Sequence, residues 1–392
     1  MRRRASISLL AAGHACVDVY QGAVAALVPY FVSERAYGYA VASGIVLAAS
    51  LLSSVAQPVF GALTDRWAMP WLLPVSTVTS GVGIALSGLG GSYGLTLVFV
   101  AVSGIGVAAY HPESARVARL ASGGSHTAMS WFSLGGNVGF ALAPLLVAVS
   151  VGHGSLRWTP VLVLPALAGA ALCVPVLRML AREEAAKPAA GTSAAPGTDD
   201  LASFLRLSLA VVLRSVVFTG LSTFIALYAQ QRVPHVPGGA PAGTLALFLL
   251  FLGGAVGSLL GGALASRYDR VRVSAGAYLV TVAAVAGVVC VPGPVMFLFV
   301  ALTSAGLYVP FSLQVTLGQD YLPSRIGTAS GVTLGLTVSI GGLASPLLGR
   351  LADATSLRTA LTPLIALPLL SCLLLRTLPE PAAPQRTVRP GR

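Results

Sequence analysis

GALTDRW, residues 61–67, closes one long apolar run, and GALASRY, residues 262–268, closes another run 201 residues later. A second pair of segments, residues 130–135 and 330–335, shares Ser, Leu and Gly at an offset of 200. Two repeats at nearly the same spacing indicate that the chain consists of two related halves. These stretches decide the fold, because the architecture must then contain the same series of apolar runs twice.

The apolar runs are long enough to span a membrane. Hydrophobic residues make up 55% of the 392-residue chain and charged residues only 9%, whereas an ordinary soluble domain has about 25% charged residues. A bilayer core of about 30 Å requires about 20 apolar residues per helix. We expect spans at roughly 6–31, 38–63, 71–89, 94–115, 125–150, 158–179, 203–230, 242–266, 272–291, 294–318, 325–349 and 357–378. The sequence therefore predicts an all-α membrane protein with twelve transmembrane helices in two six-helix, pseudo-symmetric bundles.

Composition and charge predict the domain boundaries and the topology. Residues 182–202 are rich in Ala, Pro, Gly, Ser and Thr, which predicts a flexible cytoplasmic linker. It separates an N-terminal bundle (1–181) from a C-terminal bundle (203–378), which a cytoplasmic tail (379–392) follows. In this topology 18 of the 24 basic residues lie inside, one lies in mid-membrane (Arg214) and five lie outside: Arg35, Arg157, Arg232, Arg350 and Arg358. The positive-inside rule then predicts a multi-pass protein of the plasma (inner) membrane with both termini in the cytoplasm.

Several classes of function are excluded by what the sequence lacks. The net charge is +12, but the basic residues sit at helix ends and do not form the basic, aromatic-containing groove that nucleic-acid binding requires. The cysteines lie in four different apolar runs without metal or disulfide spacing: Cys16, Cys173, Cys290 and Cys372. There is no phosphate-binding P-loop, no zinc-ligand spacing and no Gly-x-Ser-x-Gly motif. We therefore expect no nucleic-acid partner, no cofactor and no metal, and a protein that is not an enzyme and uses a gradient as its energy source.

The first predicted span contains an ionisable pair. His14 and Asp18 are four residues apart and so lie on one face of a helix. An ionised carboxylate near mid-membrane costs at least about 2.5–3.5 kcal/mol. Asp18 should therefore be protonated, paired or in contact with a water-filled cavity, and all three conditions suit a proton carrier. The alternative is that His14 and Asp18 only bond each other and lock the helix packing.

A second group of ionisable residues ends the fourth span. His111 is followed by a helix-perturbing proline and by Glu113, which can pair with Arg116 on the same face. Protonation of Glu113 would free Arg116 for another anion, so this pair could link proton binding to substrate binding. The alternative is a fixed salt bridge at the cytoplasmic mouth. The corresponding stretch of the second half, residues 309–312, keeps the proline and has neither ionisable group.

The second half contributes one mid-membrane ion, Arg214 in span seven. An arginine at this depth requires an acidic partner or an anionic ligand, and Asp18 on the equivalent first span is a candidate partner. Polar side chains in spans normally face the bundle interior, where they either contact a ligand or bond neighbouring helices. On this basis we expect further substrate-binding groups at Tyr20, Gln21, Asn137, Tyr228, Tyr308 and Gln314.

Glycines and prolines in spans five and eleven predict a hinge or proton seal, or else close helix packing. Small residues let helices approach closely, and prolines can bend them. The candidates for gating are Gly139, Pro144 and Pro346. Asp65 and Arg66 stand at the cytoplasmic end of span two, where the alternative to a gating role is an ordinary loop position.

These motifs resemble those of a known family. Residues 61–66 are similar to the signature loop between spans two and three of the major facilitator superfamily. Within that superfamily the chain resembles the fosmidomycin-resistance-type exporters, through Gly13-His14 with Asp18, residues 111–119 and residues 318–331. The resemblance implies two six-helix bundles, a gating latch at Asp65 and proton-coupled antiport that exports a small polar or anionic drug such as fosmidomycin.

Two other functions remain open at this point. The same fold could perform proton-coupled symport or exchange of an organic anion such as a sugar phosphate or carboxylate. The chain could also be a non-transporting membrane receptor or scaffold, although the linker and tail are short for that role. Six plus six helices joined by a cytoplasmic linker are the plan of a transporter whose halves rock about a midplane site. The partners expected are a small-molecule substrate, protons and the lipid bilayer, with a monomeric chain.

Overall fold

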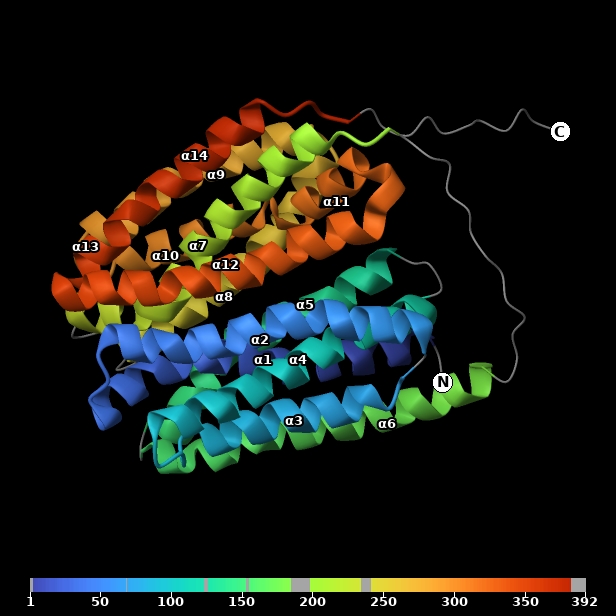
Figure 1. Cartoon of the computed structure of the whole chain (residues 1–392), viewed down its shortest axis with the longest axis horizontal. Coiled ribbons are helices and arrows are strands. Elements are labelled where there is room, and N and C mark those ends of the chain that lie inside the picture. Colours follow the sequence, from blue (N-terminus) through green and yellow to red (C-terminus); the bar gives the residue numbers. More distant parts are fainter. Residues whose placement is uncertain are drawn as a thin grey trace.

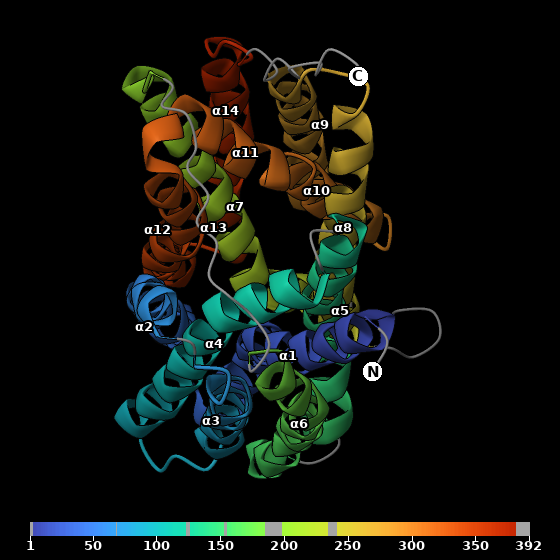
Figure 2. The ribbon, with the colours of Figure 1, turned by 90° about the vertical axis from the view of Figure 1, so that its right-hand side faces the viewer.

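The computed structural model describes residues 3–67, 69–122, 126–152, 155–184, 198–233 and 241–381, and within these ranges it is helical without strands. The helices form two groups that follow the chain order (Figures 1 and 2). The first half contains α1 (Arg3–Arg35), α2 (Tyr39–Arg66), α3 (Leu72–Ser87), α4 (Tyr93–Ser122), α5 (His126–Val151), η1 (Leu156–Val163) and α6 (Leu164–Glu184). The second half contains α7 (Leu201–Arg232), α8 (Ala242–Ala265), α9 (Arg270–Cys290), α10 (Met296–Tyr308), α11 (Phe311–Tyr321), η2 (Pro323–Arg325), α12 (Ile326–Ala354), α13 (Leu357–Leu361), η3 (Thr362–Ile365) and α14 (Ala366–Arg376).

The predicted fold is confirmed, and each predicted span corresponds to a helix or a short series of helices. Three spans are interrupted by a proline, which lacks an amide hydrogen and collides with the carbonyl four residues before it. Pro160 lies in η1 before α6, Pro310 separates α10 from α11, and Pro363 lies in η3 before α14. Pro112, by contrast, lies inside the continuous helix α4, which does not end there and runs on to Ser122.

The predicted boundaries of the linker and the tail need correction. Helix α6 continues to Glu184 and α7 begins at Leu201, so both ends of the 182–202 segment are helical. Residues 198–200 are not helical, and residues 185–197 lie outside the described residues. The start of the predicted tail is bound to the second half, because Glu380 pairs with Arg270 of α9 at 2.8 Å.

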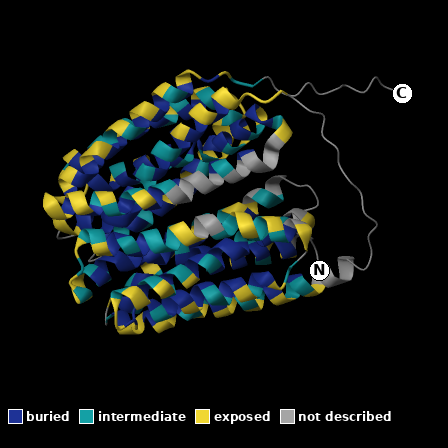
Figure 3. Ribbon diagram, in the orientation of Figure 1, coloured by how far each residue is buried: buried dark blue, intermediate teal, exposed yellow. Residues whose placement is uncertain are grey.

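The outward surface suits a lipid environment. Among the described residues, ten helical segments are long and apolar enough to cross a membrane, and α3 is a shorter apolar helix. Large apolar side chains are exposed, including Leu347 at 66% and Leu164 at 59%. Figure 3 shows buried residues lining the inner sides of the helices and exposed ones facing outward. Because hydrocarbon tails solvate such side chains, their exposure needs no protein partner.

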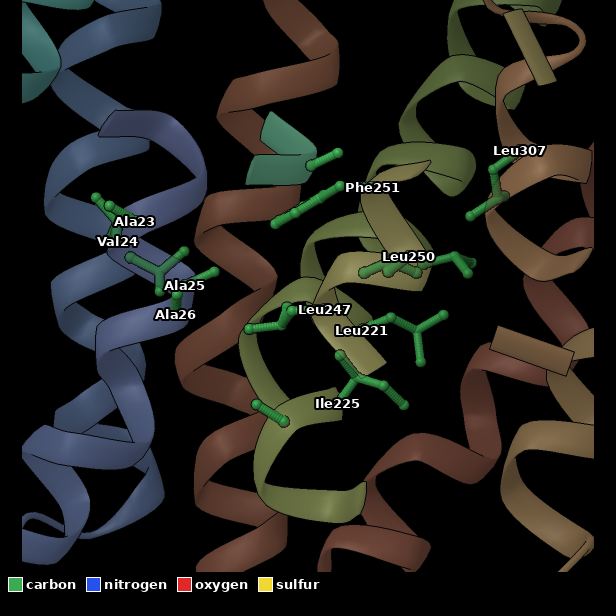
Figure 4. Close-up of a cluster of buried hydrophobic side chains, with 14 of the residues drawn as sticks. Ala23, Val24, Ala25, Ala26, Leu221, Ile225, Leu247, Leu250, Phe251 and Leu307 are labelled. Atoms are coloured by element: carbon green, nitrogen blue, oxygen red, sulfur yellow. The ribbon is translucent and has the colours of Figure 1, made fainter. Parts of the chain in front are cut away.

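The two halves meet along two seams, α2 against α12 and α5 against α8. We call the end of the molecule where α1 passes into α2 the Tyr39 end, and the end where α6 stops and α7 begins the linker end. In Figure 1 the ribbons of α2 and α12 lie closest at the Tyr39 end and diverge toward the linker end. A continuous cluster of buried apolar residues includes both halves. Figure 4 shows part of it, with residues 23–26 of α1 and Leu247, Leu250 and Phe251 of α8.

Glycines let α1 and α5 pack closely within the first half. A Cβ atom at Gly135 would collide with the backbone carbonyl of Ala11, and one at Gly139 with that of Ala15. The contacting atoms are backbone, so they cannot move without shifting a helix. The small-residue pattern of span five is therefore a helix-packing surface.

Gly139→Ala is expected to lower the stability by about 1–3 kcal/mol, because the added methyl group overpacks the interface between α1 and α5. The measurement is the thermal unfolding midpoint in detergent. Gly61→Ala is the matched control, because a Cβ at Gly61 meets nothing within 4 Å and alanine favours the helix. An equal or higher midpoint for Gly139→Ala than for Gly61→Ala would contradict the close approach.

Candidate functional site

An ion-pair cluster of three side chains lies in the middle of the first half. Asp18 is 5% exposed, and its two carboxylate oxygens face two histidines. His14 Nε2 lies 3.3 Å from Oδ2, and His111 Nε2 lies 3.2 Å from Oδ1. The two candidate groups that the sequence placed on spans one and four are therefore partly one site, and we call His14, Asp18 and His111 the ion-pair cluster.

The backbone determines which nitrogen of each histidine carries a hydrogen. His14 Nδ1 lies 3.0 Å from the carbonyl oxygen of Phe132, and His111 Nδ1 lies 2.8 Å from that of Val107. A carbonyl oxygen only accepts hydrogen bonds, so each Nδ1 must be the donor. Each Nε2 is then the nitrogen that gains or loses a proton, and both Nε2 atoms face Asp18.

This arrangement gives the cluster two proton-binding positions. Each of the two positions is a contact between a histidine Nε2 and an Asp18 oxygen. When neither contact holds a proton, a nitrogen lone pair faces an oxygen lone pair in each of them, and the cluster has a charge of −1. One proton makes it neutral, and two protons give it a charge of +1.

The space for the cluster is provided by α5. A Cβ atom at Gly136 would lie 2.8 Å from His14 Cε1 and closer still to the Asp18 carboxylate, so a side chain there would occupy the cluster. The ring of Phe132 stacks on His14 with centroids 4.4 Å apart. The buried ring of Tyr110 lies 6.0 Å from His14. Low-polarity surroundings of this kind strengthen the electrostatic interactions inside the cluster.

The predicted pairing of Glu113 with Arg116 is confirmed. Both carboxylate oxygens of Glu113 accept from the guanidinium: Nε donates to Oε2 at 2.9 Å, and a terminal nitrogen donates to Oε1. The Glu113 side chain is fully buried and that of Arg116 is 27% exposed. The carboxylate therefore depends on this guanidinium for the neutralisation of its charge, while the arginine side chain stays partly exposed.

Arg214 is buried in the second half against two aromatic rings. Its side chain is 2% exposed, and its Cζ atom lies 4.9 Å from the ring centroid of Phe311 and 5.6 Å from that of Tyr308. A terminal nitrogen approaches the carbonyl oxygen of Leu307 at 3.4 Å. The ion pairs of Asp18 are with the two histidines, so the candidate pairing of Asp18 with Arg214 is not present in this conformation.

Other predicted binding residues bond to neighbouring helices. Tyr20 donates to the carbonyl of Leu162 at 2.9 Å, Tyr228 donates to that of Val289 at 2.8 Å, and the Gln314 amide donates to the Tyr278 hydroxyl at 2.8 Å. These bonds correspond to the interhelical alternative stated above. Two further predicted residues, half-buried on α1 and α5 respectively, are Gln21 and Asn137.

The predicted gating residues are distributed over both ends of the molecule. Arg66 is exposed at the end of α2, with its guanidinium 5.7 Å from the ring of Trp67, and the side chain of Asp65 lies outside the described part. Pro144 is buried in α5 and borders a cavity of about 560 Å³ between α1, α5, α7 and α8. Pro346 is half-buried in α12. The interface at the Tyr39 end is thus incompletely filled along the α5–α8 seam.

The ion-pair cluster also has the residue types of a metal site. Among the described residues, it is the one group of three or more His, Cys, Asp or Glu whose ligand atoms come close enough, within 4.8 Å of one another. The two ion pairs already use both oxygens of Asp18.

Sequence reasoning missed four residues that the structure places in functional positions. Phe132, Tyr110 and Phe311 surround the buried ions, and Asp353 connects the halves. Tyr110 is next to His111 in the sequence, which is a usable signal. Phe132 and Phe311 are ordinary apolar residues of their spans, and Asp353 stands at the end of a span like many solvated acids, so no local pattern marks them.

The chain is similar to known transporters over nearly all of its length. The model of the Major Facilitator Superfamily matches residues 10–346. The fosmidomycin resistance protein of Escherichia coli is 32% identical over 396 residues, which cover 95% of this chain and 93% of that protein. An uncharacterized MFS-type transporter of Bacillus subtilis, YfnC, is 30% identical over 376 residues, which cover 92% of this chain and 89% of that protein.

Solved structures with the same fold are also transporters. A bacterial homologue of the human lysosomal transporter Spinster, in an inward-facing and unoccupied conformation, has a TM-score of 0.75 at 16% identity, covering 96% of this chain and 97% of that one. A mutant of the nucleoside transporter NupG has a TM-score of 0.73 at 10% identity, covering 95% and 99%. At these identities the likeness shows the fold alone.

Proposed function

The chain belongs to the Major Facilitator Superfamily and is a multi-pass membrane transporter, and from this premise we propose that it exports a small polar or anionic compound in exchange for protons. The observation that carries the proposal is the ion-pair cluster, in which one buried carboxylate lies between two histidines whose Nε2 atoms both face it. We also propose that it resides in the inner membrane as a monomer with both termini in the cytoplasm. The linker end is then the cytoplasmic end.

Protons are the driving ion in this proposal. The cluster changes its charge from −1 to +1 as two protons bind, and Asp18 lies about midway along the 33 residues of α1. A charge change in this low-polarity interior alters the free energy of any ion nearby far more than it would in water. One proton that crosses about 100 mV supplies about 2.3 kcal/mol, which supports a gradient of about 50-fold for a neutral solute.

The substrate is recognised by the two arginines that lie at or near the membrane interior. Arg214 lies against two aromatic rings and Arg116 is only partly covered by Glu113, and both suit an anionic group. A proton on Glu113 would release Arg116 for the substrate, whereas an ionised Glu113 competes with it. A substrate such as fosmidomycin, suggested by the resistance protein that shares 32% identity, has the required chemistry.

The test is accumulation of labelled fosmidomycin in inside-out membrane vesicles whose lumen is acidified. We expect accumulation well above that of vesicles without the protein, and its loss on addition of an uncoupler. A symporter would instead carry the compound out of the lumen with the protons. The same assay with a panel of anionic compounds addresses the substrate class, and pH-independent flux of every compound in the panel would contradict proton coupling.

A further inference from the structure

A carboxylate of the second half caps a helix of the first half at the Tyr39 end. The backbone N–H of Tyr39 donates to Asp353 Oδ1 at 2.8 Å, and that of Ala40 donates to Oδ2 at 2.9 Å. Tyr39 and Ala40 begin α2, whereas Asp353 lies in the last turn of α12. Both oxygens of one side chain are therefore used to bridge the two halves.

Helix α2 has no cap of its own. The first four N–H groups of an α-helix have no partner within the helix, and a Ser, Thr, Asp or Asn directly before the helix usually accepts from them. In α2 this position is Gly38, which provides no side-chain hydrogen bond. A negative charge at this end also interacts favourably with the helix dipole. The capping interaction that most helices find in their own segment comes here from the opposite half.

Glycines lie at the contact between the start of α2 and the end of α12. A Cβ atom at Gly38 would lie 3.2 Å from Asp353 Oδ2, and one at Gly349 would lie 2.7 Å from Ala40 Cα. Gly349 and Asp353 are one turn apart on α12, so they present one face to the start of α2. These two glycines give the backbones room to approach, and the approach brings the carboxylate onto the amides.

A second polar contact reinforces this end of the seam. The Gln231 side chain of α7 donates to the Tyr39 hydroxyl at 2.9 Å. The Tyr39 ring also lies 6.4 Å from that of Phe224, in an edge-on arrangement. Tyr39 therefore contacts the second half through its backbone, its ring and its hydroxyl.

We propose that Asp353 is a positioning residue that sets the conformational equilibrium of the transporter, by capping α2 only while the halves are together at the Tyr39 end. When the halves part there, the amides of Tyr39 and Ala40 lose the carboxylate, and α2 has no residue in its own half to replace it. The closed arrangement is therefore favoured by the contribution of one N-cap, which corresponds to about 5- to 30-fold in population. This inference depends on the rocking of two halves and not on the substrate or the driving ion.

The test is a distance measurement between spin labels at Ser33→Cys in α1 and Arg358→Cys in α13, in nanodiscs and with the four native cysteines replaced by alanine. We expect Asp353→Ala to raise the ratio of the long-distance to the short-distance population about 5- to 30-fold. The matched control is Asp269→Ala, which removes an exposed carboxylate at the linker end that makes no side-chain cap, and it should leave the ratio unchanged. An unchanged ratio in Asp353→Ala would overturn the proposal.

A second variant separates control of the equilibrium from simple helix stabilisation. In Gly38→Ser combined with Asp353→Ala, serine caps α2 within its own half. Thermal stability should then recover relative to Asp353→Ala, while the long-distance population stays high. Recovery of the closed population together with stability would show that Asp353 only stabilises α2, and the proposal would then fail.

Discussion

Asp18→Asn is expected to abolish proton-driven transport while the protein remains folded and still exchanges substrate for substrate. The amide has nearly the shape of the carboxylate but cannot carry the exchangeable proton. The NH₂ group of the asparagine donates permanently to the Nε2 atom of one histidine, so one of the two proton-binding positions is lost. The substitution also removes the negative charge that attracts a proton to the second position. The cluster can then no longer alternate between charges of −1 and +1.

The measurement compares two modes of flux in the same vesicles. Uptake driven by an acidic lumen should fall to the level of vesicles without the protein, and exchange of labelled for unlabelled substrate in the absence of a pH difference should persist. Asp269→Asn serves as the control, because this carboxylate is exposed and outside the cluster. Undiminished pH-driven uptake in Asp18→Asn would remove Asp18 from the mechanism, and loss of both modes would indicate damage to the fold or to the substrate site.

Arg116→Ala is expected to cost about 3–5 kcal/mol of unfolding free energy, because it leaves the fully buried carboxylate of Glu113 without its partner. The penalty comes from the uncompensated charge and not from the lost ion pair itself. Glu113→Gln combined with Arg116→Ala should therefore be considerably more stable than Arg116→Ala alone. Unfolding in mixed detergent micelles, followed by tryptophan fluorescence, measures all three proteins.

The decrease in unfolding free energy in Arg116→Ala distinguishes a buried ion pair from a solvent-exposed one. Exposed ion pairs contribute about 0–1 kcal/mol, so a loss in that range would show that water reaches Glu113. Arg206→Ala is a suitable control, since Arg206 is exposed and donates to the carbonyl of Thr377 at 3.2 Å. It should change the stability little.

The two halves contribute different polar groups to this transporter. The protonatable cluster and the pair of Glu113 with Arg116 lie on α1 and α4, and the second half contributes Arg214 and the aromatic rings of α10 and α11. Proline placement shows the same divergence, because α4 runs through Pro112 whereas Pro310 separates two helices. A duplicated fold has thus kept its plan of spans while its polar residues diverged.

The sequence was sufficient for the plan of the fold because hydrocarbon leaves the backbone few choices. Each span must satisfy its own amides and expose apolar side chains, so runs of about 20 apolar residues predict the helices directly. The same rule made the buried ions conspicuous: His14, Asp18, Glu113 and Arg214 are exceptional in such runs, and all four are buried in the structure. The pairing of Glu113 with Arg116 was also predictable, because three residues separate neighbours on one helix face.

The amino-acid sequence was therefore enough to predict the plan of spans, the two halves, and which residues carry charge into the membrane. The tertiary structure alone decided that His111 joins Asp18, that Arg214 lies against Phe311 and Tyr308, and that Asp353 caps α2. Periodicity shows which face of a helix is polar, but the helix that it meets depends on how all the helices pack and rotate. That packing is set by close contacts over long sequence separations, such as Gly136 against the ion-pair cluster and Gly349 against Ala40.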